Sequence, residues 1–125
     1  MILDTNALSA FAEGSTEVAA ALQSSVQPAI PVVVLAEYLY GIAHSTRRRI
    51  YETWLDRYLP TFRVLEITME TATEYAAIRS ELKQVGRPIP ANDVWIAALC
   101  RQHELPLLSR DRHFDYVRHL RRTEW

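Results

Sequence analysis

The chain has 125 residues, of which 49% are hydrophobic, and its formal net charge at pH 7 is −1. This length suits one domain with one core and excludes two domains of ordinary size. No stretch approaches the roughly twenty apolar residues of a membrane span, and the first residues lack the basic start and cleavage site of a signal peptide. We therefore expect a single domain over residues 1–125 that is soluble and cytoplasmic.

The first nine residues are typical of a buried strand that turns into a helix. Ile2 and Leu3 lead into Asp4, and small polar residues follow. In an open α/β sheet the carboxyl ends of the strands form the functional edge, so we expect Asp4 to face a crevice. The alternative is that Asp4 only caps the following helix, whose dipole favours an acid at this position.

A second acid follows the next predicted strand. Residues 29–35 are rich in valine and predict a short buried strand. Glu37 comes directly after it, as the only ionisable group in a long apolar run. An unpaired buried carboxylate is costly, so Glu37 should be paired, protonated or bound to a metal, unless it lies at the surface at a helix start.

The middle of the chain predicts two helices on either side of a strand. Apolar side chains recur at helical spacing over residues 46–59, residues 62–67 alternate as in a strand, and a second helical pattern runs from Thr68 or Thr71 towards Val85. These apolar side chains are ordinary core candidates. The alternation of strands and helices indicates an α/β fold with a parallel sheet.

Two more acids occupy corresponding positions in the second half. Residues 91–100 predict a helix buried on every side, and Asp93 lies in its first turn. Residues 106–109 predict a short buried strand, with Asp111 just beyond it, and a last edge strand is expected near Leu120. Capping alone would also account for an acid at such positions.

Four carboxylates in one crevice would repel one another strongly unless a divalent cation neutralised them. Oxygen ligands favour hard cations such as Mg²⁺ or Mn²⁺ over zinc. No histidine has the spacing of a zinc site, and we expect His103, His113 and His119 to be surface or capping residues. Two arginine clusters, at 47–49 and 110–122, would suit phosphate groups or simply a solvated surface.

Four segments together resemble a PIN domain, specifically a VapC-type toxin ribonuclease. They are residues 3–6 (LDTN), Glu37 after its valine-rich strand, residues 92–98 (NDVWIAA) and residues 107–114 (LLSRDRHF). The resemblance covers essentially the whole chain in the right order. It implies an α/β fold: a single PIN-like domain with a parallel sheet of about five strands and helices on both faces.

The resemblance also implies which side chains form the site. Asp4, Glu37, Asp93 and Asp111 fall where the family has its catalytic, metal-binding acids, Thr5, Asn6 and Ser109 match supporting polar positions, and Asp115 is a second candidate near the fourth acid. One departure is that the strand before Asp4 is short, which predicts weak pairing of that strand.

The function implied is that of a metal-dependent endoribonuclease that cleaves single-stranded or loop RNA with Mg²⁺, or Mn²⁺, as cofactor. Such a toxin of a type II toxin-antitoxin pair would have a cognate antitoxin and form a homodimer. The alternative is a non-catalytic RNA-binding or signalling α/β domain whose acids are caps. A receiver domain is disfavoured, because it would need a lysine after its fifth strand. A phosphatase of the haloacid dehalogenase type is disfavoured as well, because it would need an aspartate where Asn6 stands.

Overall fold

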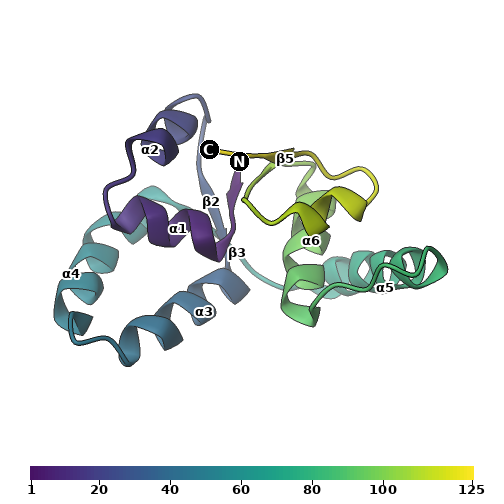
Figure 1. Ribbon diagram of the computed structural model, residues 1–125, viewed down its shortest axis with the longest axis horizontal. Coiled ribbons are helices and arrows are strands. Elements are labelled where there is room, and N and C mark those ends of the chain that lie inside the picture. The colour runs from purple at the N-terminus through teal and green to yellow at the C-terminus, as the bar shows by residue number, and fades with distance from the viewer.

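The computed structural model describes residues 1–125 and is built around one five-stranded sheet in the order β3-β2-β1-β4-β5 (Figure 1). All neighbouring strands are parallel. The strands are short: β1 is Ile2–Leu3, β2 Ala29–Pro31, β3 Arg63–Leu65, β4 Leu107–Leu108 and β5 Arg122–Thr123. The predicted parallel sheet of about five strands is confirmed.

β1 is as short as the sequence indicated, with two residues, but it pairs with a strand on each side. Ile2 pairs with Ala29 of β2 on one side and with Leu107 of β4 on the other. Ile2 and Leu3 are fully buried, because β1 is the central strand. After β1 the chain adds β2 and β3 on one side of the sheet, and it later adds β4 and β5 on the other side of β1. The strand order therefore reverses between β1 and β4. Ligands of open α/β sheets bind at the carboxyl ends of such strands.

Six helices cover the two faces of this sheet. In Figure 1, α1 to α4 lie on one side of the strands and α5 and α6 on the other. This arrangement confirms the predicted helices on both faces. The helices are α1 Thr5–Ala12, α2 Thr16–Gln23, α3 Val32–Ala43, α4 Arg48–Tyr58, α5 Met69–Gln84 and α6 Ala91–His103, with 3₁₀ turns η1 at Leu59–Thr61 and η2 at Arg112–Tyr116.

The valine-rich segment is divided differently from the prediction. We expected a strand over residues 29–35, but β2 ends at Pro31 and α3 begins at Val32. Proline lacks the N–H that a longer ladder would need, and its φ of −59° suits the residue before a helix. Glu37 therefore lies in the middle of α3 and not at a helix start.

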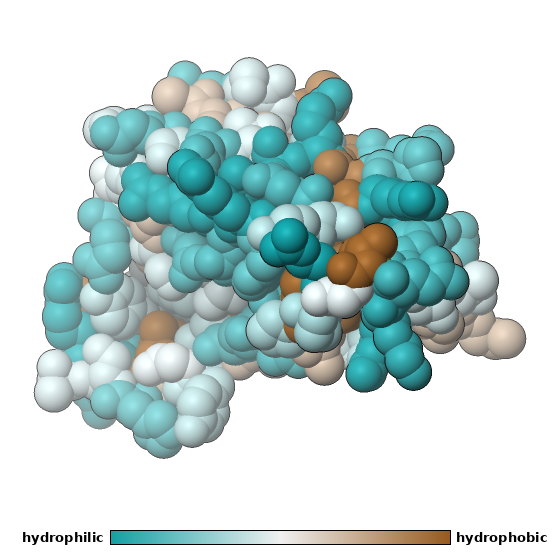
Figure 2. Space-filling model, turned by 45° about the vertical axis from the view of Figure 1, so that its right-hand side comes forward, coloured by the Kyte–Doolittle hydropathy of each residue, from teal (hydrophilic) through white to brown (hydrophobic).

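The core is one cluster of 26 buried hydrophobic residues. The predicted all-round burial of α6 is confirmed for residues 96–100, which are at most 2% exposed, whereas Ala91 and Asn92 at its start are exposed. Cys100 is one of them and is a free, buried cysteine. On the face drawn in Figure 2 the surface is largely hydrophilic, with only small hydrophobic patches. None of the helices combines the length and the apolar character needed to cross a membrane.

Candidate metal centre

A cavity of about 530 Å³ opens at the carboxyl ends of the central strands. Four carboxylates from four different parts of the chain line it, and no lysine or arginine is among the lining residues. The structure thus brings together all four acids that the sequence singled out, as well as Thr5 and Asn6. The lining residues are Asp4, Thr5, Asn6, Glu37, Pro90, Ala91, Asn92, Asp93 and Asp111.

Asp4 is the most buried of the four acids, with 4% of its surface exposed. Its Oδ1 accepts a hydrogen bond of 2.6 Å from the Thr5 backbone N–H, and its Oδ2 accepts one of 2.6 Å from the Ser109 hydroxyl. Asp4 therefore caps α1 and also lines the crevice. Burial raises the pKa of Asp4; the two hydrogen bonds oppose this shift, and the charges of Asp111 and Glu37 add to it.

Short polar side chains hold the neighbouring acids. The Thr5 hydroxyl donates to Oε1 of Glu37 over 3.1 Å, so α1 and α3 are joined at the edge of the cavity. The Asp111 backbone N–H donates to the Ser109 hydroxyl oxygen over 3.0 Å, and Nδ2 of Asn6 donates to Asp111 over 3.4 Å. The buried Ser109 hydroxyl thus connects Asp4 with the loop that carries Asp111.

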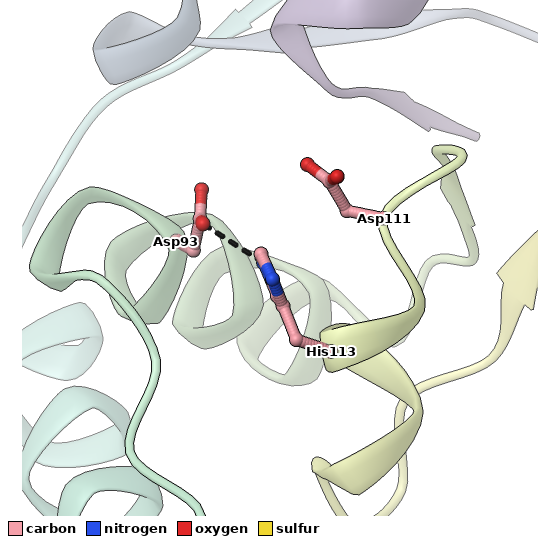
Figure 3. Close-up of side chains that lie close together, drawn as sticks. All are labelled: Asp93, Asp111 and His113. Carbon is pink, nitrogen blue, oxygen red and sulfur yellow. Dashed lines mark ion pairs between the residues drawn. The ribbon is translucent and has the colours of Figure 1, made fainter.

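Asp93 stands in the first turn of α6, opposite the loop after β4. Nε2 of His113 lies 2.8 Å from Oδ2 of Asp93, and in Figure 3 the Asp111 carboxylate faces the same space. One ligand atom from each of the three residues lies within 4.8 Å of the others. The expectation that His113 is only a surface or capping residue was wrong. Its partner belongs to a distant segment, so no local pattern marks it.

Burial raises the pKa of Asp93 to about 6, in spite of the positive charge of His113, which opposes the shift. The charges of Asp4, Asp111 and Glu37 push it in the same direction as burial. The protein alone therefore disfavours full ionisation of the cluster. A divalent cation would relieve this repulsion, which makes the cavity a candidate metal centre.

Without added metal, we expect the free energy of unfolding to fall as the pH rises from about 4 to about 6. The pKa of Asp93 is higher in the folded chain than its ordinary value of 3.8, so in this window the folded state binds more protons than the unfolded state. Each rise in pH within the window therefore favours the unfolded state, because Asp93 must ionise inside the fold. The loss should be about 1–3 kcal/mol, measured by urea unfolding in EDTA. Asp93→Asn should flatten the profile, and Mg²⁺ should stabilise the protein more at pH 7 than at pH 4.5. A flat profile of the unmodified chain would contradict this.

Asp115, the second candidate for the fourth acid, does not line the cavity. It forms a bidentate pair with Arg122, at 2.8 and 3.0 Å. Nη1 of Arg122 also donates to the Ser109 carbonyl over 3.0 Å and lies 2.9 Å from Glu124. This arginine from the predicted phosphate-binding cluster is thus used inside the protein, where it holds the loop between Ser109 and Asp115.

The fold and the site define a doubly wound α/β domain with carboxylates gathered where its strand order reverses. The family model described as PIN domain matches residues 1–120, and the chain belongs to the PIN-domain family. This confirms the family that the four sequence segments indicated.

Individual relatives are similar over most of their length. Ribonuclease VapC5 of Mycobacterium tuberculosis is 30% identical over 115 residues, which cover 90% of this chain and 84% of the relative. Toxin FitB of Neisseria gonorrhoeae is 31% identical over 121 residues, with coverages of 89% and 87%. Among solved structures, a chain of the toxin-antitoxin complex from Klebsiella pneumoniae matches with a TM-score of 0.76 at 26% identity, covering 95% of this chain and 93% of that one.

Proposed function

We propose that this protein is a metal-dependent endoribonuclease that hydrolyses RNA phosphodiesters, and that it is the toxin of a type II toxin-antitoxin pair. The observation that carries the proposal is the cavity in which four carboxylates meet with no lysine or arginine among the lining residues. Membership of the PIN-domain family and the similarity to a VapC ribonuclease support it.

The residues present fit a hard divalent cation, which we take to be Mg²⁺ or Mn²⁺. Asp4, Asp93, Asp111 and Glu37 would hold it, because carboxylate oxygens are the preferred ligands of these ions. Burial, together with the charges of the neighbouring carboxylates, raises the pKa of Asp4 and of Asp93, and a bound cation would offset both effects. When bound, the cation supplies Lewis-acid charge, which activates water for attack on a phosphodiester and stabilises charge on the phosphate.

Hydrogen bonds from neighbouring groups would hold the acidic side chains in fixed positions. Ser109 and the Thr5 backbone fix both oxygens of Asp4, and the Thr5 hydroxyl fixes Glu37. Arg112 directly follows Asp111 in the chain; its side chain is 82% exposed, with only a long contact of 3.8 Å to Glu124, and would attract the phosphates of an RNA strand. Unpaired nucleotides are the expected substrate, because only a splayed strand can bring its backbone into such a site.

We also propose a cognate antitoxin as protein partner, on the similarity to Toxin FitB and to the toxin-antitoxin complex from Klebsiella pneumoniae. An arginine from such a partner would pair with the carboxylates and compete with the metal. Co-expression with the partner should therefore relieve any growth inhibition that the chain causes alone. The homodimer and the cytoplasmic location stay predictions.

Cleavage of a single-stranded RNA pool by the purified chain tests the enzymatic proposal. We expect cleavage with Mg²⁺ or Mn²⁺, none with EDTA, and recovery when Mg²⁺ is added in excess. A preparation of Asp4→Asn made in the same way controls for contaminating nucleases. Equal cleavage by the variant or in EDTA would contradict the proposal, and RNA binding without cleavage would favour the non-catalytic alternative.

A further inference from the structure

A second cavity, of about 300 Å³, lies beside the metal centre between α1, α3 and the start of α4. The two cavities share Thr5 and Glu37, whose hydrogen bond of 3.1 Å marks the boundary between them. A molecule held at the carboxylates would therefore have the second cavity directly within reach.

Tyr38 forms part of the wall of this cavity and is only 5% exposed. Its hydroxyl is buried and has no hydrogen-bond partner. Tyr51 and Glu13 line the same cavity. Leaving a buried hydroxyl unpaired costs stability, so a small movement of the wall that brings this hydroxyl to a bound molecule would be favourable.

Gly41 lines the same cavity from the last turn of α3. Glycine is unfavourable inside a helix, and no contact within this chain requires it, because a Cβ at Gly41 would meet nothing within 4 Å. Gly41 lies one helical turn after Glu37 and thus shares its face. The missing side chain keeps the wall of the cavity open next to the metal centre.

We propose that this cavity, the base pocket, binds one unpaired nucleobase of the RNA next to the phosphate that is cleaved. This inference rests on the proposed function. Glu13 and Glu37 both line the base pocket, so a phosphate would be repelled and a neutral ring is the better occupant. Apolar Ile42 and Ala12 suit the faces of such a ring, and the hydroxyl groups of the wall suit its polar edge.

The hydrogen-bonding groups of the lining residues favour guanine among the bases. The Tyr51 hydroxyl donates to the Glu13 carboxylate, which leaves acceptor sites of this carboxylate free. Guanine presents two neighbouring donors, the ring N–H and the 2-amino group, whereas uracil presents only one on the same edge. We therefore expect cleavage next to guanine to exceed cleavage next to uracil.

Gly41→Leu tests the base pocket directly, because it fills the cavity and improves the helix propensity of α3. Cleavage of a single-stranded RNA pool should fall about tenfold or more, and the base preference next to the cut should disappear. Ala43→Leu is the matched control, since Ala43 is exposed on the same helix and does not line the cavity. Gly41→Leu should unfold at or above the temperature of the unmodified chain and Ala43→Leu close to it, and Mg²⁺ should stabilise both variants equally.

A binding experiment separates this inference from the nuclease proposal. Guanosine titrated into the metal-free protein should shift the NMR signals of Tyr38 and Gly41 more than uridine does, also in Asp4→Asn, and neither nucleoside should shift them in Gly41→Leu. If the chain fails to cleave RNA but binds guanosine in this way, only the enzymatic function is overturned. Unchanged rate and base preference in Gly41→Leu, or loss of a protein partner in that variant with RNA cleavage unaffected, would overturn the base pocket.

Discussion

Asp4→Asn is expected to reduce metal-dependent RNA cleavage by about a thousandfold or more, because it removes the most central charge of the cluster. Asparagine keeps the volume of the side chain but cannot neutralise a divalent cation. Asp93→Asn should have a similar effect, since Asp93 faces the same cavity from α6. Cleavage rates at several Mg²⁺ concentrations would show whether affinity or turnover is lost.

The fold should survive Asp4→Asn. The asparagine carbonyl can accept from the Thr5 N–H as Oδ1 of Asp4 does, and the amide can donate to the Ser109 hydroxyl oxygen. Since burial raises the pKa of Asp4, a neutral side chain there also removes a cost at neutral pH. Asp56→Asn is the matched control, an exposed acid on α4 outside the cavity. Full cleavage by Asp4→Asn, or unfolding of that variant, would contradict this account.

The sequence was sufficient to predict the sheet and the four acids because each depends on a local pattern. A short apolar strand, an acid and then a helix places Asp4 at the carboxyl end of β1, and the same logic places Asp111 after β4. The fully apolar helix after Asp93 indicated burial on all sides, which the structure confirms for residues 96–100. Parallel strands deliver such positions to one edge without any knowledge of detailed contacts.

The remaining features depend on contacts between distant segments. His113 of η2 pairs with Asp93 of α6, and no spacing in the sequence connects these two residues. The boundary between β2 and α3 was misplaced because valine favours strands, whereas Pro31 ends the ladder there. The same holds for Tyr38, since only the packed structure shows that its hydroxyl is buried without a partner.

The contrast between Asp111 and Asp115 gives the second large expected effect. Asp111→Asn should reduce cleavage by about a hundredfold with little change in stability, because its carboxylate lines the cavity and its backbone N–H still donates to Ser109. Asp115→Asn should instead preserve turnover at saturating Mg²⁺. It should lower the free energy of unfolding by about 1–2 kcal/mol, since Asp115 is half exposed but its partner Arg122 is only 11% exposed.

Arg122 also explains why Asp115→Asn should raise the Mg²⁺ concentration needed for half-maximal cleavage. The hydrogen bonds from Arg122 keep the pKa of Asp115 below its ordinary value, and the same guanidinium donates to the Ser109 carbonyl. Loss of the bidentate pair would loosen the loop on which Ser109 orients Asp4 and Asp111. Glu124→Gln, which weakens the other carboxylate contact of Arg122, should give a smaller shift in the same direction. If Asp115→Asn abolished turnover at saturating metal while Asp111→Asn did not, Asp115 and not Asp111 would be the fourth acid of the site.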